Sequence, residues 1–304
     1  FARNIMNMRF MLTAEYEDKS WPRYFWQHNY DLLPCNPVLV GVKGVEADEQ
    51  KCILSTVTEN GRRVSNYLDK LERHVRIDLY DPTRDEILLG LLARISRLFM
   101  HVTHDTGLWS IDSGGIFLRC LVETAITFGY LAQHGTAEDF DSFKKYGEGR
   151  EKLLMLQFQD NYPGAKTRDG RSEQDLLEGL GGGFWPEFMD IELGWWTKKS
   201  SRELAIAAGL EKLYRLVYDP TSGDVHGTWP SLKASNLALC AQPLHRFHWL
   251  PSIGDRPLLI KTVADAQEIY LTAVDLAGEH LKYPLPDEQL APVPDQQVAA
   301  ERND

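Results

Sequence analysis

Apolar residues recur at helical spacing through most of this chain, and this pattern constrains its fold more than any other feature. Between residues 59 and 79 they stand at Val64, Tyr67, Leu68 and Leu71, with charged residues between them. This spacing puts an apolar stripe on one face of a helix. No long stretch alternates apolar and polar residues, as half-buried strands do. The 304 residues therefore predict an all-α fold, a helical bundle.

Further helices are expected along the chain, and one of them should be central. Residues 116–133 follow a Gly114-Gly115 pair and are apolar on most faces, which is typical of a helix inside a bundle. The Asp81-Pro82 pair predicts a helix start, with Asp81 as the cap, and Ser200 with Glu203 predicts a capping box. Other helices are expected at residues 136–160, 172–178, 211–217 and 261–283, and a glycine-rich hinge at 179–183.

Both ends of the chain differ from this helical middle. Residues 1–45 are aromatic and irregular, so we expect an N-terminal arm that packs on the bundle or on a second subunit. Residues 284–304 are acidic, rich in proline and poor in large apolar side chains, which predicts a disordered tail. The expected organisation is an arm at 1–45, a bundle domain at 46–283 and a tail at 284–304.

Charge and composition exclude several classes of function. A net charge of −11 and a pI near 5.3 disfavour wholesale phosphate binding, although a local basic groove is compatible with them. The longest apolar run, residues 87–92, is far shorter than a membrane-spanning helix, so no membrane contact is expected. Four cysteines without a C-x-x-C pair predict neither a disulfide framework nor a zinc knuckle, and they favour a reducing, cytoplasmic compartment.

Two histidine pairs offer a metal-binding alternative. His101 with His104, and His245 with His248, stand three residues apart, a spacing from which a helix could hold zinc or iron. Neither pair has the E-x-x-H companion of di-iron bundles. Solvated or core histidines are therefore the favoured interpretation, with no metal ligand assigned and no cofactor expected.

The clearest set of candidate site residues begins on the apolar helix. Arg119 and Glu123 lie four residues apart there, an unfavourable place for charges unless they are paired or face a cleft. His226 could act as a general acid or base, while Arg119 holds a phosphate or a developing anion and Glu123 orients it. The alternative is a buried polar network in which Glu123 neutralises Arg119 and His226 donates to a carbonyl.

Tyr218, Ser222 and His226 stand at i, i+4 and i+8 and would share one face of a continuous helix. Pro220 argues against that continuity and favours a new helix start capped by Asp219. Tyr218 and Ser222 are assigned as substrate-positioning groups.

Two separated segments resemble domain-of-unknown-function family 5677, a bacterial family. "IFLRCLVETAITFGYLAQ" carries an R-x-x-x-E helix, and "WWTKKSSRELAIAAGLEKLYRLVYDPTSGDVHG" ends in Y-x-x-x-S-x-x-x-H-G. The matching positions are Arg119, Glu123, Tyr218, Ser222, His226 and Gly227, and the resemblance covers residues 81–283. The family is similar in outline to HEPN-type helical bundles, many of which are metal-independent ribonucleases of toxin and phage-defence systems. The resemblance implies no settled activity for the family itself.

HEPN ribonucleases use an R-x(4–6)-H motif, commonly completed across a dimer. Arg23 with His28, Arg94 with His101, and Arg97 with His104 have that spacing. With nine histidines in the chain, chance gives a comparable number of matches, so the spacing does not discriminate.

Lys198, Lys199 and Arg202 form a compact basic run near the family motif, either a solvated helix start or a patch that faces RNA. The expected function is a HEPN-like metal-independent ribonuclease in stress or anti-phage defence, acting as a homo-oligomer on RNA. One alternative is a non-catalytic binding or regulatory module whose arm docks a partner subunit. Another is a small-molecule or metal enzyme built in the bundle core.

Overall fold

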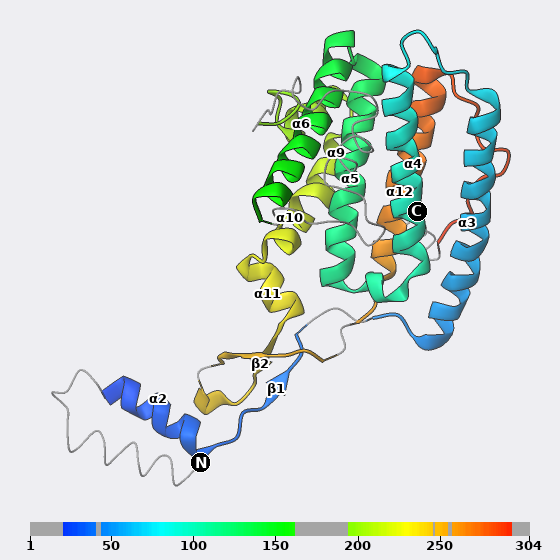
Figure 1. The fold of residues 1–304 in the computed structure, drawn as a ribbon. Helices are drawn as coiled ribbons and strands as arrows, with labels where there is room; N and C mark the ends of the chain where they lie inside the picture. Colours follow the sequence, from blue (N-terminus) through cyan, green and yellow to red (C-terminus); the bar gives the residue numbers. More distant parts are fainter. Residues whose placement is uncertain (1–20, 41–43, 162–193, 246, 255–256, 294–304) are drawn as a thin grey trace.

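The computed structural model describes residues 21–40, 44–161, 194–245, 247–254 and 257–293. Within these ranges the chain is a helical bundle with one small three-stranded sheet, which confirms the all-α prediction (Figure 1). The helix expected at residues 172–178 and the hinge expected at 179–183 lie outside the described residues.

Long helices make the bundle, and shorter ones cover one side of it (Figure 1). The long helices are α3 (Ala47–His74), α4 (Thr83–His104), α5 (Ile111–His134), α6 (Ala137–Asn161) and α12 (Ile260–Leu281). The shorter elements are η1 (Thr106–Trp109), α8 (Ser201–Ala207), α9 (Glu211–Leu213), η3 (Tyr214–Tyr218), α10 (Asp219–His226) and α11 (Trp229–Ser235).

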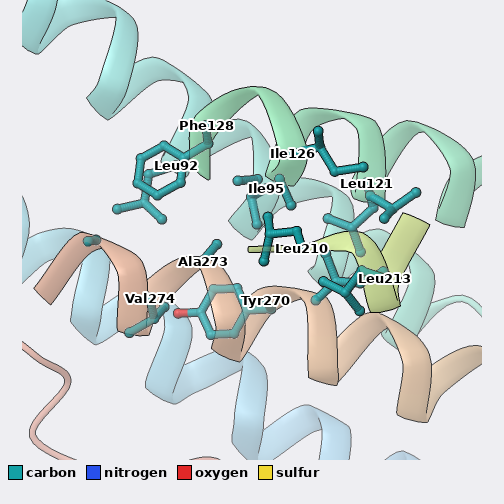
Figure 2. Close-up of a cluster of buried hydrophobic side chains, with 14 of the residues drawn as sticks. Leu92, Ile95, Leu121, Ile126, Phe128, Leu210, Leu213, Tyr270, Ala273 and Val274 are labelled. Atoms are coloured by element: carbon teal, nitrogen blue, oxygen red, sulfur yellow. The ribbon is translucent and has the colours of Figure 1, made fainter. Parts of the chain in front are cut away.

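Helix α5 lies at the centre, as its sequence predicts. It packs against α4, α12, α10 and α8. Figure 2 shows the core that results, in which Leu121, Ile126 and Phe128 of α5 meet side chains from α4, α9 and α12. Nearby, the rings of Phe99 on α4 and Tyr270 on α12 stack with their centroids 4.8 Å apart. Burial of apolar side chains on several faces of one helix is the main stabilising contribution to this bundle.

The same helix corrects one expectation from sequence. An 18-residue window within residues 113–134 has a mean hydropathy of 1.4, so α5 is long and apolar enough to cross a membrane. The prediction that no segment meets this criterion is therefore wrong. Of the apolar window, 67% is buried inside the fold, as in the core helix of a bundle.

Helix α5 also begins earlier than its glycine pair suggests. Gly114 and Gly115 lie inside the helix rather than before it. A Cβ atom on Gly114 would lie 2.5 Å from the carbonyl oxygen of Leu108, and one on Gly115 would lie 2.0 Å from Asp224 Oδ2. The pair therefore allows close packing of α5 against η1 and α10, where the sequence suggested a helix boundary.

The two predicted caps have different outcomes. Ser200 caps α8, and its side chain and that of Glu203 make both hydrogen bonds of the capping box, which confirms this prediction. Helix α4 begins at Thr83 after Pro82, and no side chain caps it. The prediction that Asp81 caps this helix is wrong.

Part of the expected tail packs on the bundle. Asn60 of α3 donates to the carbonyl of Ala291 and accepts from its N–H, and Val293 is fully buried. Arg62 pairs with Glu288 at 2.9 Å. Residues 284–293 are thus held by partly buried hydrogen bonds and an ion pair, contrary to the expected disorder, while residues 294–304 lie outside the described part.

An accessory module, defined here as residues 21–40 and 237–251, projects from one end of the bundle (Figure 1). It contains α2 (Trp21–Leu32), β1 (Pro37–Val38), β2 (Leu237–Cys240), η4 (Pro243–His245) and β3 (Trp249–Pro251). The strands are antiparallel in the order β1-β2-β3, with Pro37 opposite Cys240 and Leu239 opposite Trp249. The predicted irregular arm is thus helical over α2, and residues 1–20 lie outside the described part.

The different surroundings of Gly114 and Gly147 predict opposite effects on stability when each is replaced by alanine. Gly114→Ala should lower the Tm by several degrees, because the new methyl group overlaps the Leu108 carbonyl and Thr262. Gly147→Ala, on α6 with nothing within 4 Å, should raise the free energy of unfolding by about 0.5–1 kcal/mol. Thermal denaturation followed by circular dichroism measures both, and equal Tm values for the two variants would contradict the packing described here.

Candidate functional site

Arg119 and Glu123 form an ion pair that an aromatic ring covers. Arg119 Nη1 donates to Glu123 Oε2 at 2.7 Å, and the Arg119 guanidinium carbon lies 3.3 Å from the ring centroid of Tyr218. The Tyr218 ring stacks in turn on Tyr214, with centroids 4.6 Å apart. The side chain of Arg119 is only 14% exposed. Its charge is therefore compensated by a carboxylate and an aromatic face.

Tyr218 reaches this position through an unusual helical turn. The chain is helical from Glu211 to His226, with a π-helical turn at η3 in which Asp219 N–H bonds to the carbonyl of Tyr214. Pro220 follows directly, and Thr221 Oγ1 donates to the carbonyl of Val217 at 2.6 Å. A π turn is wider than an α turn, so it accommodates a proline that would otherwise clash with the preceding turn.

The predicted helix break at Asp219-Pro220 is therefore wrong, because Tyr218 and Asp219, where η3 meets α10, both have helical backbone angles. Tyr218, Ser222 and His226 lie on one continuous helical segment.

A pocket opens beside the covered ion pair, and we name it the α5–α8 pocket. It has a volume of ≈ 600 Å³. Its walls come from α5, η3 and the segment that leads into α8, and they are formed by Glu123, Trp195, Thr197, Lys198, Lys199, Ser200, Ser201, Arg202, Glu203, Tyr214 and Tyr218. The Tyr218 hydroxyl donates to Ser201 Oγ at 2.8 Å and so joins two of these walls.

Three cations face this pocket, and its carboxylates are already engaged. Within the described ranges no carboxylate lies within 4.0 Å of the charged nitrogens of Lys198, Lys199 or Arg202, although Asp139 and Glu203 attract Lys199 from a longer distance. Glu123 binds Arg119, while Glu203 accepts from the backbone and side chain of Ser200, which holds the pKa of its carboxyl below the usual range. The Lys199 ammonium lies 5.2 Å from the Tyr130 ring centroid, and hydrogen bonding to Tyr130 raises the pKa of this amine.

The structure thus brings together most of the predicted site residues. Glu123, Tyr218, Lys198, Lys199 and Arg202 line one pocket, and Arg119 supports its Tyr218 wall. His226 is exposed at the last turn of α10, before Gly227 in the left-handed conformation, and Ser222 is half-buried one turn earlier. In the described chain no hydrogen bond, ion pair or ring contact joins His226 to Arg119 or Glu123.

The alternative arginine–histidine pairs lie elsewhere. Arg94 and Arg97 are exposed on α4, and His101 and His104 line a separate groove of ≈ 420 Å³ between α3 and α4. His104 Nδ1 lies 2.8 Å from the carbonyl of Met100 in its own helix. Arg23 and His28 belong to α2 in the accessory module. None of these pairs lines the α5–α8 pocket.

Sequence reasoning identified only two of the four residues in one cluster, His245 and His248, and favoured solvated or core histidines there. The side chains of Cys35, Cys240, His245 and His248 meet in the accessory module, and their potential ligand atoms all lie within 4.8 Å of one another. The two cysteines are 205 positions apart, so no local spacing reveals them. The His245–His248 pair was the only local signal, and it lies on the turn that includes η4 rather than on a long helix.

Comparison with known proteins places the central part of the chain in a family. No curated protein and no solved structure matches it. The profile of "Family of unknown function (DUF5677)" matches residues 85–238, which run from α4 into β2 and include Arg119, Glu123 and the α5–α8 pocket. Because this match spans just over half of the sequence, the chain belongs to the DUF5677 family.

Proposed function

We propose that this protein binds RNA in the α5–α8 pocket. The observation that carries the proposal is the presence of Lys198, Lys199 and Arg202 at one pocket, none of them in an ion pair shorter than 4.0 Å in the described chain. Asp139 and Glu203 attract Lys199 from a longer distance. Clustered cations attract the phosphate backbone, which supplies most of the affinity in non-specific binding of nucleic acids. The rest of the molecule is acidic, so this attraction is local to the pocket.

Aromatic side chains at the same pocket favour a ligand with exposed bases. Trp195 is 46% exposed and lines the pocket with Tyr214 and Tyr218. Unpaired bases of single-stranded RNA stack on such rings, whereas a duplex hides its bases. Arg119 contributes indirectly in this proposal, because it fixes the Tyr218 ring while the three exposed cations take the phosphates.

We further propose that the protein cleaves the bound RNA. His226 would take the proton of a 2′-hydroxyl as that oxygen attacks the adjacent phosphorus. The P–O bond to the 5′ oxygen would break, and this oxygen would take up a proton. In the proposal His226 acts from a second copy of the chain, by analogy with the arginine–histidine motif that HEPN ribonucleases commonly complete across a dimer. Action during bacterial stress or phage defence rests on that resemblance alone, and a cytoplasmic location rests on the four cysteines without a C-x-x-C pair.

A second candidate function is a non-catalytic binding or regulatory module. The Arg119–Glu123 pair under Tyr218 favours it, because a cation with a carboxylate and an aromatic face as partners resembles a structural network. Exposed apolar residues on the accessory module, among them Tyr24, Tyr30 and Leu39, fit the docking of a partner subunit.

RNA binding is tested by removing the pocket cations. Lys198→Ala, Lys199→Ala and Arg202→Ala together should weaken binding of a fluorescent single-stranded RNA at least about tenfold, and should reduce the slope of log K against log salt by about 2. Fluorescence anisotropy over a range of salt concentrations measures both quantities.

The matched control removes three exposed cations from α3 and α6, Lys51, Arg73 and Lys145. This triple variant loses the same formal charge and should keep most of the affinity. If both triple variants weakened RNA binding equally, the loss of net charge alone would explain the result. This outcome would contradict a binding pocket.

The cleavage step is tested separately with His226→Ala. We expect wild-type protein to cleave total RNA and transfer RNA in the presence of a chelator, and the variant to lose at least about 100-fold in rate. Because His226 is exposed, the variant should keep the wild-type Tm. Binding without cleavage by wild-type protein would support the regulatory module, and cleavage by the variant at the wild-type rate would remove His226 from the mechanism.

The structural role of Arg119 predicts a loss of stability. Arg119→Ala should lower the free energy of unfolding by about 1–3 kcal/mol, because Glu123 loses its partner and Tyr218 its covering guanidinium. Arg215→Ala, an exposed arginine on η3, should change it by less than about 0.5 kcal/mol. Urea denaturation compares the two, and an unchanged midpoint for Arg119→Ala would show that the pair contributes nothing to the fold.

A further inference from the structure

The cluster of Cys35, Cys240, His245 and His248 has the dimensions of a metal site. Cys35 Sγ lies 3.5 Å from His245 Nδ1 and 3.6 Å from His248 Nε2, and Cys240 Sγ lies 3.5 Å from His245 Nδ1. A tetrahedral Zn²⁺ holds sulfur at about 2.3 Å and nitrogen at about 2.0–2.1 Å, which puts such atoms about 3.6 Å from one another. The three separations are therefore those of three edges of a tetrahedral zinc site.

Hydrogen bonding between the four side chains explains this arrangement less well. His245 Nε2 lies 3.1 Å from the carbonyl oxygen of Asn29, which only accepts, so Nε2 carries the ring proton. Nδ1 then has a single lone pair, and it faces the sulfur atoms of both Cys35 and Cys240. One lone pair directed between two sulfur atoms suits a shared cation better than two thiol hydrogen bonds.

The surroundings resemble the outer shell of a metal site. The carbonyl of Asn29 fixes the tautomer and ring orientation of His245, the role that backbone carbonyls play next to zinc-binding histidines. The Tyr30 ring lies 5.4 Å from the His245 ring and 5.5 Å from the His248 ring. Asn29, Cys240 and His245 are buried, while Cys35 and His248 are half-buried, so the cluster is partly sheltered from solvent.

The accessory module has no hydrophobic core of its own. Among its described residues only Asn29, Ala238, Cys240 and His245 are buried, and its sheet has three short strands. An assembly this small needs an additional crosslink to be stable. A metal site that joins the segment after α2 with the end of β2 and the turn before β3 supplies one.

We propose that Cys35, Cys240, His245 and His248 form a structural Zn²⁺ site that holds the accessory module together. Two thiolates and two neutral imidazoles are a ligand set that zinc favours, and four protein ligands leave no open position for catalysis. Binding releases the two thiol protons, so the ion and its ligands are together neutral. The site is independent of RNA binding, and all four of its residues lie outside the DUF5677 match.

The test compares cysteines inside and outside the cluster in the full-length protein. Wild-type protein loaded with Zn²⁺ and then dialysed should retain equimolar zinc by mass spectrometry, and Co²⁺ in its place should give the visible spectrum of a tetrahedral thiolate complex. Cys35→Ser and His248→Ala should lower zinc affinity more than about 100-fold. Cys52→Ser and Cys120→Ser, which change the two cysteines outside the cluster, should bind as wild type.

A second measurement separates metal binding from misfolding. Chelation of wild-type protein should speed tryptic cleavage at Arg23 in the accessory module, leave the helical signal of the bundle unchanged, and be reversed by added Zn²⁺ alone. A Cys35–Cys240 disulfide in the purified protein, no zinc or cobalt binding by wild type, or equal binding by Cys35→Ser and Cys52→Ser would each overturn the proposal.

Discussion

The burial of α5 is the constraint on which the rest of this structure depends. Because the helix is apolar on most faces, it must be covered from several directions, and α4, α12, α8 and α10 do so. The only charged side chains among residues 113–134 are Arg119 and Glu123, apart from the terminal His134. Their desolvation requires compensation, which each provides for the other beneath the Tyr218 ring. The α5–α8 pocket lies beside this ion pair, and Glu123 and Tyr218 form part of its wall.

Much of the fold could be predicted from the sequence, because periodicity and capping are local signals. The apolar spacing of α5 and the capping box at Ser200 both correspond to what the structure shows. The errors have a common cause in tertiary packing. Gly114 suggested a helix boundary, but it is required by the approach of Leu108, and Pro220 suggested a break, but a π turn accommodates it. Neither the close approach of Leu108 to Gly114 nor the π turn before Pro220 can be inferred from neighbouring residues in the chain.

In the candidate site, too, local spacing reveals some features and tertiary packing determines the others. The pairing of Arg119 with Glu123 follows from their spacing on one helix, and the sequence itself shows that Lys198 and Lys199 belong to a basic run. That these groups share a pocket with Tyr218 depends on how α8 and η3 pack on α5, which no spacing encodes. The Cys/His cluster depends on tertiary structure, because Cys35 is separated from Cys240, His245 and His248 by the entire central bundle. Local motifs therefore find residues with chemistry, and packing decides which of them meet.

The pairing of Val38 with Leu239 across β1 and β2 has a consequence for the order of assembly. It closes a loop of about 200 residues, for which the chain entropy lost is about 5 kcal/mol. The two residue pairs that join β1 to β2 cannot offset this entropy loss in an unfolded chain. The bundle must therefore form first and bring the two ends of the loop close together. We expect the accessory module to be the last part of the molecule to fold, and the first to open when its crosslinks are removed.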